Sequence, residues 1–472
     1  MSKRRGFVVD DKFPDVTACL EKAGWTACPH HTYPTCLFRY TNYVKIQWKF
    51  VKPHQTINHL ENAILLSRKH ELLRHLEVRR GHAMYYPRST TSIETWFRMF
   101  LYTQALLVLK NPSTYPAMLP MALAIGLEIQ RLNDKPREAR AAGLCLMEDA
   151  FLEDHADAIG DWVNQLDPVA PRGTLMRETA PDVVASIGGG GGIHSNPPSL
   201  DALLLHLEAC DPQFHFISTR NIWIAKPSGL SQGRGIELIA SRAQLEAFKA
   251  GHEDKAVVIQ QYVERPFLIL GRKFDIRQWV LVTATAPLTI YWYRECYLRF
   301  SSKAYSLAAD DAIHDKYMHL CNNSIQKTGD APDHPDIPGN MWGLDRFQLH
   351  LSELGVRDRW DNHTVPAMQH ACVEALQSVQ PKLKRIGHGF EWLGLDFILD
   401  EQLTPWLLEV NVSPDVSHST DTTAALVPRA TASILECKMV LGKSMDNQSE
   451  YVSDHHHATV VSDDEWSLIW QA

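Results

Sequence analysis

The sequence lacks the features that would mark a membrane, secreted or disulfide-bonded protein. Its longest uninterrupted apolar run, residues 117–127, contains Pro120 and is too short to cross a bilayer. The residues after Met1 include no apolar h-region, so neither a signal peptide nor a membrane segment is expected. Nine cysteines are scattered without CxxC pairs or a framework spacing, which is typical of reduced thiols in a cytosolic protein.

The chain also lacks an overall excess of basic residues. Its net charge is −8, which argues against a general nucleic-acid binder. The charge is uneven, because residues 446–472 hold six acids and no Lys or Arg, whereas residues 255–303 hold eight Lys or Arg against three acids. A basic stretch in a nearly neutral body predicts an anionic ligand at a defined place. The length of 472 residues predicts two or three domains.

The order of the expected elements indicates an α/β (α+β) fold. Apolar residues at helical spacing predict a helix over residues 57–76, and a capping box at Thr91–Glu94 predicts another over residues 96–109. Residues 118–166 are expected to be largely helical. Beyond Ser199, strand-like segments alternate with helices; the strand candidates are residues 223–226, 257–260, 279–283, 288–292 and two runs within residues 390–414.

Changes in composition divide the chain into expected segments: an N-terminal α/β module (1–85), a central domain with helices and a Gly-rich loop (86–268), a C-terminal domain (269–445) and an acidic tail (446–472). The five glycines within residues 187–193 are not followed by Lys-Ser/Thr, so they predict a mobile linker rather than a phosphate cradle. We interpret the tail as a solvated polar segment, with docking of residues 466–470 onto a partner as the alternative.

One candidate phosphate site is the stretch WIAKPSGLSQGRGI, in which a strand ends at Lys226 and a Ser/Gly-rich loop follows. Gly233 and Gly235 bracket Arg234 in this loop. Glycines let backbone N–H groups approach an anion, and Lys or Arg neutralises its charge. The order, lysine first and glycines after, is not that of a Walker loop. A surface hairpin with one snorkelling lysine is the alternative.

A second candidate region runs from the end of one strand into the next. Residues 260–266 close an apolar strand, where an adenine could take backbone hydrogen bonds beside a hydrophobic wall. Lys273, Asp275 and Arg277 then alternate with other residues, so that all three charges share one face of a strand. A solvated outer face is the alternative. Arg299 adds a cation at another strand end.

The two strands within residues 390–414 hold the strongest candidate for a metal site. Glu409 and Asn411 are two residues apart and share a face, and a turn near residues 400–404 would bring Asp396 across to the same face. Two carboxylates and an amide are hard oxygen ligands that suit Mg²⁺. A buried polar network is the alternative. The segment HLCNNS (319–324) contains His and Cys, but no partner ligands stand at zinc spacing.

Taken in order, these stretches resemble the ATP-grasp ligases and, more narrowly, the tubulin tyrosine ligase-like family. The resemblance rests on WIAKPSGLSQGRGI, VVIQQYVERPFLILGRKFDIRQWVLVT, YLRFSS, HLCNNSIQK and LGLDFILD…WLLEVNVSP, which cover roughly residues 220–415. HLCNNSIQK and the later NMWGLDRFQLHL are similar to the corresponding segments of the tubulin glycylases. The implied fold is an ATP-grasp fold with an N-terminal α/β module and a helical insertion.

The resemblance also implies roles for individual residues. Lys226 and Lys273 would hold the ATP phosphates, with Asn322 close to them and the loop of Arg234 and Gly235 closing over them. Gln260, Gln261 and Val263 would form the adenine hinge, and Asp275 would contact the ribose. The implied Mg²⁺ ligands are Asp396, Glu409 and Asn411, and Arg277 and Arg299 would face the acyl phosphate and the acidic peptide. Lys69 would be the counterpart of a functional lysine. The chain departs from many relatives in having Gln261 where they have lysine.

The function that the resemblance implies is ATP-dependent ligation of glycine to glutamate side chains of tubulin C-terminal tails, through an acyl phosphate. Catalysis would rest on charge neutralisation and alignment, with Arg277, Arg299 and Glu409 as the catalytic residues. The expected partners are tubulin, microtubules and free glycine. The protein is expected to be a monomer and to lie in the cytoplasm, the cytoskeleton or a cilium. The alternatives are a glutamate or tyrosine ligase of the same fold and an inactive microtubule-binding relative.

Overall fold

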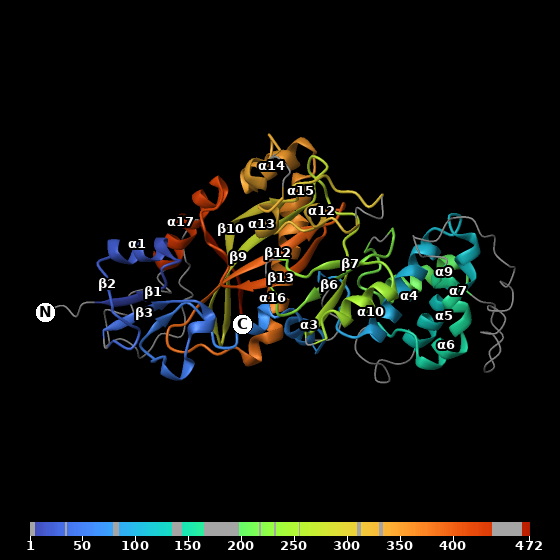
Figure 1. Cartoon of the computed structure of the whole chain (residues 1–472), viewed down its shortest axis with the longest axis horizontal. Coiled ribbons are helices and arrows are strands. Elements are labelled where there is room, and N and C mark those ends of the chain that lie inside the picture. The colour runs from blue at the N-terminus through green and yellow to red at the C-terminus, as the bar shows by residue number, and fades with distance from the viewer. Residues whose placement is uncertain are drawn as a thin grey trace. The chain divides into compact units, whose positions relative to one another are not determined.

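The structure, a computed structural model, describes residues 5–33, 35–78, 85–134, 144–164, 198–216, 219–230, 233–253, 255–308, 313–329, 334–436 and 465–472 (Figure 1). The chain forms two compact units. Unit 1 consists of Met1–His75, Phe267–Ala304 and Leu320–Ala472, and unit 2 consists of Leu76–Pro266 and Tyr305–His319. The units therefore differ from the four predicted segments, because the N-terminal module and the C-terminal domain form one unit. The predicted linker at residues 187–193 lies outside the described residues.

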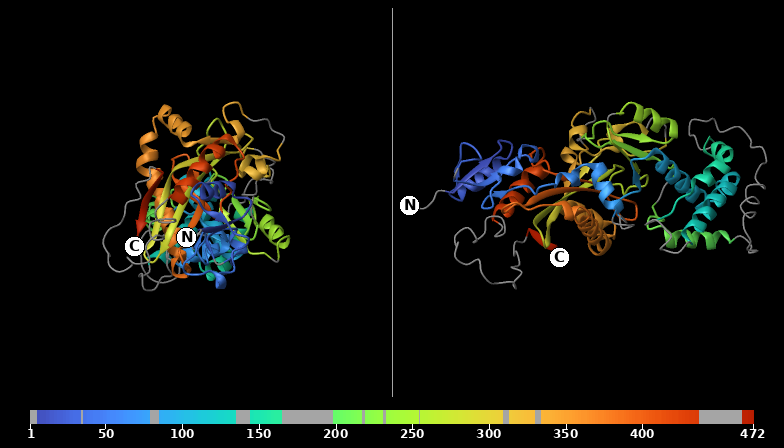
Figure 2. Two further views of the ribbon diagram at one scale, coloured as in Figure 1. Left: turned by 90° about the vertical axis from the view of Figure 1, so that its left-hand side faces the viewer. Right: turned by 90° about the horizontal axis from the view of Figure 1, so that it is seen from below.

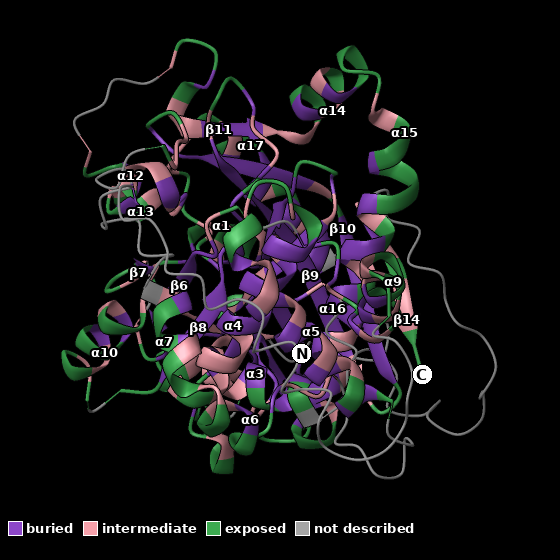
Figure 3. Cartoon of the chain, turned by 90° about the vertical axis from the view of Figure 1, so that its right-hand side faces the viewer, coloured by how far each residue is buried: buried purple, intermediate pink, exposed green. Residues whose placement is uncertain are grey.

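Unit 1 is built on a six-stranded antiparallel sheet with the order β11-β10-β9-β12-β13, in which β14 also pairs with β10. Its strands are β9 (Phe274–Thr285), β10 (Leu288–Phe300), β11 (Met341–Gly343), β12 (Glu391–Leu399), β13 (Pro405–Val412) and β14 (Trp466–Gln471). Every residue of β12 is buried, and Figure 3 shows β9 and β10 largely in the colour of buried residues. The charged side chains of β9 and β12 are therefore inside the unit and need partners there.

The helices of unit 1 lie on and around this sheet. Their bounds are α13 (Asn323–Gln326), α14 (Leu344–Glu353), α15 (Arg357–Arg359), α16 (Val365–Val379) and α17 (Asp421–Glu436). The long helix α16 contacts β10 and β13, and α17 contacts β11. Ala371, Leu376 and Val379 are among the buried residues of α16, as the apolar spacing of residues 367–379 requires.

The N-terminal module of unit 1 is a small parallel sheet with the order β2-β1-β3-β4. Its elements are β1 (Gly6–Val9), α1 (Pro14–Lys22), β2 (Thr26–Ala27), β3 (Cys36–Tyr40) and β4 (Thr56–Ile57). Phe7, Leu20 and Phe38 belong to the same hydrophobic core as Trp279 of β9 and Trp392 of β12. Helix α1 lies beside α17, as Figures 1 and 2 show. The module therefore completes the core of unit 1.

Two details of unit 1 correct the predictions. The single helix predicted over residues 57–76 is divided into α2 (Ile64–Ser67) and α3 (Lys69–Val78), because Arg68 between them has extended backbone dihedrals. The end of the predicted acidic tail forms β14, in which Trp466 is buried. Trp466 therefore packs on its own chain, whereas Leu468 is exposed.

Unit 2 combines helices with a four-stranded antiparallel sheet of the order β5-β8-β6-β7. The strands are β5 (Ser89–Thr90), β6 (Trp223–Pro227), β7 (Glu237–Ile239) and β8 (Val257–Gln261). The helices are α4 (Ile93–Lys110), α5 (Leu119–Asn133), α6 (Asp149–Asp154), α7 (Ala156–Asn164), α9 (Leu200–Cys210), α10 (Arg242–Ala250) and α12 (Lys316–His319). Ser92, rather than Thr91, caps α4 by accepting a hydrogen bond from the Thr95 N–H at 3.2 Å.

One hydrophobic core joins the helices of unit 2 to one face of its sheet. Trp96 and Phe100 of α4 belong to it together with Trp223 of β6 and Ile259 of β8. Because side chains alternate along a strand, Lys226 and Gln260 face the opposite side. Within the described residues no helix is both long and apolar enough to cross a membrane. The mixture of helices and sheets in the two units confirms the predicted α/β class.

Candidate active site

The charged face predicted on β9 is buried. Lys273, Asp275 and Arg277 are each 6% exposed, so the alternative of a solvated outer face is wrong. The strand lies between β10 and β12 in the middle of the sheet, and both of its neighbours carry further charges. Burial of several charges in one place requires that they pair with one another.

Register places the partners opposite each other. Arg277 lies across from Asp396 of β12, and Asp275 lies across from Arg299 of β10. Arg277 donates from Nε to Asp396 Oδ1 at 2.5 Å and from Nη2 to Asp396 Oδ2 at 3.1 Å. Arg299 donates from Nε to Asp275 Oδ1 at 2.6 Å, and its Nη2 lies 2.9 Å from Asp396 Oδ2. The four side chains form one ion-pair network.

The charges of this network depend on one another. Burial disfavours the charge of Arg299, but Asp275 and Asp396 raise its pKa well above the usual value. Burial raises the pKa of Asp275, against the opposing effect of Arg299. Arg299 Nη2 is buried and has no hydrogen-bond acceptor among the described residues, because its 2.9 Å contact with Asp396 is not aligned for a hydrogen bond. A buried donor of this kind can donate a hydrogen bond to an anionic oxygen without losing another hydrogen bond.

The hairpin of β12 and β13 brings the predicted metal ligands together. Asp396 lies directly opposite Glu409. The Asn411 side-chain nitrogen lies 3.2 Å from Asp396 Oδ2 and 3.2 Å from Glu409 Oε1. The turn falls at residues 400–404 as predicted, where Asp400 Oδ1 accepts backbone N–H groups from Gln402 and Thr404 at 2.9 Å each. Asp396, Glu409 and Asn411 share one face of the sheet because side chains alternate between the two faces along each strand.

The donor set of these three residues fits Mg²⁺. The described residues contain no group of three or more His, Cys, Asp and Glu side chains placed to hold a metal, but here the third donor is an amide. The Asn411 amide sits where Asp396 and Glu409 converge, and turning it by half a revolution would present Oδ1 and make the set all oxygen. Asp396, Glu409 and Asn411 are thus the residues that would hold the ion.

Lys69 also reaches this cluster. It is the first residue of α3, its side chain is 11% exposed, and its Nζ lies 2.9 Å from Glu409 Oε2. The break at Arg68 sets the start of α3 and therefore the direction of Lys69. The polar network of the hairpin thus includes Lys69, Arg277 and Arg299 as well as the three predicted ligands.

Lys273 and Asn322 belong to the same unit. Burial lowers the pKa of Lys273 to about 8, although Cys321 and Asp275 oppose the shift. Cys321 Sγ donates to the Lys273 carbonyl at 3.6 Å, and Asn322 follows it as the first residue before α13. The Asn322 side chain makes no capping bond to that helix, so it stays available for other contacts.

In unit 2 the structure brings some predicted nucleotide residues together and separates others. Lys226 donates to Gln260 Oε1 at 2.6 Å, and Gln260 donates to Ser89 Oγ at 3.1 Å. Gln261 points to the other face of β8, where it accepts from Arg88 Nη1 at 2.8 Å. Its side chain therefore does not join Lys226. Val263 is buried.

The predicted Gly-rich loop has the backbone that its glycines suggest. Gly233 and Gly235 have positive φ angles of 71° and 67°, which L side chains rarely adopt. Arg234 and Gly235 are exposed. Arg88 is the residue that sequence reasoning missed, because a single arginine before a short strand carries no motif. Its contact with Gln261 depends on the pairing of β5 with β8.

Comparison with known proteins identifies the family. The profile of the Tubulin-tyrosine ligase family matches residues 199–448. The chain is 40% identical over 255 residues to the tubulin monoglycylase TTLL3 of Homo sapiens, a stretch that covers 52% of this chain and 32% of that protein. It is 38% identical over 256 residues to the protein monoglycylase TTLL8 of Mus musculus, which covers 53% of this chain and 30% of that protein.

A third relative is the tubulin glycylase 3A of Drosophila melanogaster, with 37% identity over 243 residues, or 51% of this chain and 24% of that protein. The matched part thus spans about a third or less of these relatives. The family profile covers more than half of this chain and includes β6, β8, β9, β10, β12 and β13, and the mixed helix and sheet architecture agrees with an α/β ATP-grasp-like fold. The chain belongs to the tubulin-tyrosine ligase family.

Proposed function

We propose that this protein is an ATP-dependent ligase that joins glycine to glutamate side chains of tubulin C-terminal tails. The observation that carries the proposal is the polar network of Asp396, Glu409 and Asn411 with Lys69, Arg277 and Arg299 in unit 1. The names of the related glycylases support the choice of glycine and tubulin. The partners would be tubulin and microtubules, and the protein would act in the cytoskeleton of the cytoplasm or a cilium.

The chemistry would proceed in two steps. The γ-phosphoryl group of ATP moves to a glutamate carboxylate of the tail, which forms an acyl phosphate and releases ADP. The amine of glycine then attacks the acyl carbon, forms the isopeptide bond and loses a proton as inorganic phosphate leaves. Bound Mg²⁺ would supply neutralisation of phosphate charge. Neither of the two reaction steps needs a covalent bond to the protein.

The charges of unit 1 suit this reaction. In the described part of the chain, Lys69, Arg277 and Arg299 pair with Glu409, Asp275 and Asp396, and Lys273 adds a fourth buried cation to this unit. Both substrates of the first step are anions. Cations held in place by buried ion pairs need no rearrangement when the transferred group develops its charge. Arg299 Nη2, which makes no hydrogen bond within the described residues, would donate one to an oxygen of the acyl phosphate.

The experiment that tests the proposal is incorporation of labelled amino acids. The purified protein is incubated with tubulin, ATP, Mg²⁺ and radiolabelled Gly, Glu or Tyr in separate reactions. We expect incorporation of glycine only, and loss of signal when the tubulin tails are removed by protease. Incorporation of glutamate or tyrosine without glycine would replace the proposal by a different ligase of the same family. No incorporation of any of them would favour an inactive binder.

The lowered pKa of Lys273 predicts a pH dependence of ATP binding. Above its pKa of about 8 the amine is neutral and no longer attracts phosphate, so the KM for ATP is expected to rise by roughly 10-fold from pH 7 to pH 9. An unfolded lysine keeps its proton to a pH of about 10.4, so in this window the unfolded state binds more protons and the group adds stability as pH rises. Unfolding of the protein would therefore not explain the rise in the KM for ATP between pH 7 and pH 9.

The matched variant is Lys273→Arg, whose guanidinium stays charged throughout this range. Its KM for ATP is expected to stay flat between pH 7 and pH 9. A rise of the same size in Lys273→Arg would assign the pH dependence to another group.

A further inference from the structure

A buried polar cluster in unit 1 joins the segment after β4 to the start of β12. His59 in that segment and Glu391, the first residue of β12, are each 1% exposed. His59 Nδ1 lies 2.6 Å from Glu391 Oε1. The other oxygen of Glu391 accepts the backbone N–H of Leu60 at 2.8 Å. Both carboxylate oxygens therefore have a partner in the segment that follows β4.

The other ring nitrogen of His59 reaches the end of β13. Nε2 lies 3.2 Å from Ser413 Oγ and 3.0 Å from the carbonyl oxygen of Thr41. The ring of Tyr43 packs edge-on against the imidazole, with 5.3 Å between the ring centroids. Contacts at both nitrogens and a neighbouring ring fix the direction of the imidazole, so that His59 can hold Ser413 in place.

Ser413 is the residue at which the chain leaves β13, and its backbone is strained. Its φ angle is 63°, in the left-handed region that residues other than glycine, asparagine and aspartate seldom adopt. Such a conformation persists only where neighbouring contacts hold it. The approach of its hydroxyl to His59 is a contact of this kind.

The turn at Ser413 returns the chain to the charged face of the sheet. A Cβ atom added to Gly394 of β12 would lie 3.0 Å from Pro414 Cβ and 3.1 Å from Arg277 Cδ. Pro414 and Arg277 therefore lie against this glycine, which is also the residue opposite Asn411 in the ladder of β12 and β13. The direction that the chain takes at Ser413 thus affects how Asn411 is held beside Arg277.

The segment that begins at His59 also carries Lys69. Helices α2 and α3 follow, and Lys69, the first residue of α3, has its Nζ 2.9 Å from Glu409 Oε2. The Asn411 side-chain nitrogen lies 3.2 Å from the other oxygen of Glu409. Two side chains that contact Glu409 from different parts of the chain are therefore attached to segments that meet at His59.

We propose that His59 is a positioning residue for the Mg²⁺ site of Asp396, Glu409 and Asn411. Its contact with Ser413 holds the end of β13, so that the three metal ligands converge. The inference rests on the proposed function, because the metal site is part of it. Residues that orient metal ligands from outside typically contribute a factor of about 10 to 100 in metal affinity.

The test is the affinity of the full chain for Mn²⁺, which also takes oxygen ligands, measured by electron paramagnetic resonance. The protein is saturated with a non-hydrolysable ATP analogue, and a blank without protein gives the Mn²⁺ that the nucleotide binds alone. Ser413→Ala removes the hydroxyl and is expected to weaken Mn²⁺ binding by ~10-fold. In labelled incorporation, its KM for Mg²⁺ should rise while kcat at saturating Mg²⁺ stays within ~3-fold of the wild type.

A second variant tests whether Ser413 acts through His59. His59→Asn keeps a donor near the position of Nδ1 and loses Nε2, so we expect the same weakening of Mn²⁺ binding as in Ser413→Ala. The double variant is expected to bind no more weakly than either single variant, because both changes remove one shared contact. If His59→Asn does not fold, the Ser413 variants carry the comparison.

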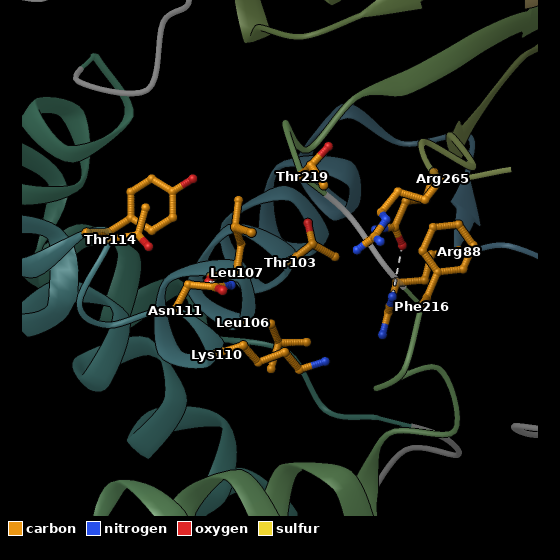
Figure 4. Close-up of a pocket in the computed structure, with 12 residues that line it drawn as sticks. Arg88, Thr103, Leu106, Leu107, Lys110, Asn111, Thr114, Phe216, Thr219 and Arg265 are labelled. Atoms are coloured by element: carbon orange, nitrogen blue, oxygen red, sulfur yellow. Dashed lines mark hydrogen bonds between the residues drawn. The ribbon is translucent and has the colours of Figure 1, made fainter. Parts of the chain in front are cut away.

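Two control variants separate positioning from a general loss of stability. Ser417→Ala makes the same change in the exposed stretch that follows, and it should not alter Mn²⁺ binding. Thr103→Val removes a hydroxyl of α4 in unit 2, drawn in Figure 4, that donates to Asn221 Oδ1 at 2.7 Å. It is expected to lower the temperature of thermal unfolding and to leave Mn²⁺ affinity unchanged.

Equal Mn²⁺ affinity in the wild type and in folded Ser413→Ala would overturn the proposal. Ser413→Gly adopts the positive φ without strain and also lacks the hydroxyl, so it is expected to bind as weakly as Ser413→Ala. Wild-type affinity in Ser413→Gly would assign the loss to backbone strain and would also overturn the role of His59. Absence of Mn²⁺ binding to the wild type, or binding that Glu409→Gln leaves intact, would instead refute the metal site itself.

Discussion

Glu409→Gln is expected to lower ATP-dependent amino-acid incorporation by ~100-fold or more while the protein stays folded. Glu409 is the predicted Mg²⁺ ligand that also pairs with Lys69, and the amide keeps its shape but loses the negative charge. A group that positions charge in the transition state contributes a rate factor of about 100 to 1000. The Glu409 side chain is 23% exposed, so loss of its ion pair should cost little stability. Labelled incorporation and thermal unfolding measure the two effects.

The control is Glu401→Gln, the same chemical change at the exposed turn of the same hairpin. It is expected to leave activity unchanged. Tubulin binding should persist in both variants, which separates loss of catalysis from loss of the substrate. Wild-type activity in Glu409→Gln would refute the assignment of this residue to the metal.

The second large effect is expected from Arg299→Met, which should lower the free energy of unfolding by roughly 3–5 kcal/mol, because it leaves Asp275 and Asp396 buried with one cation fewer. Activity should be lost as well, since the Nη2 donor proposed to bind the acyl phosphate disappears with the side chain. Urea denaturation gives the change in stability, and labelled incorporation gives the change in rate. Adding Asp275→Asn should recover part of the stability because it removes the carboxylate that Arg299 had neutralised.

Arg429→Met provides a matched control for this variant. Arg429 also contacts two carboxylates, Glu295 at 2.6 Å and Glu465 at 3.8 Å, but its side chain is 48% exposed. Its replacement is expected to cost less than about 1 kcal/mol. Equal destabilisation by the two substitutions would show that the buried network does not depend on Arg299 in the way that its geometry implies.

Local patterns predicted much of the candidate site. Alternation along β9 placed Lys273, Asp275 and Arg277 on one face, and the turn of the later hairpin brought Asp396 to Glu409 and Asn411. Both inferences use the period of a strand, which depends only on neighbouring residues. The same pattern could not decide whether the face was buried, because burial depends on β10 and β12 packing on either side.

Contacts across the chain could not be predicted in this way. The pairing of Lys69 with Glu409 depends on a helix break at Arg68, a residue with no glycine or proline beside it to signal the break. Arg88 and Gln261 meet because short strand β5 pairs with β8. The composition of residues 446–472 suggested a solvated tail, but the apolar residues at its end outweigh the acids before them and form β14.

The core of unit 1 is formed by segments far apart in the sequence, which affects when this unit can fold during synthesis. Phe7 packs in one core with Trp392 and Leu435, so its partners leave the ribosome roughly 20–90 s later at a rate of about 5–20 residues per second. β10 has one unpaired edge over residues 289–293 until Gln471 has emerged. Most of unit 2 is consecutive in the chain and can fold during this wait. Unit 1 therefore cannot complete its sheet until residue 471 has left the ribosome, and until then the edge of β10 is open to pairing with another chain.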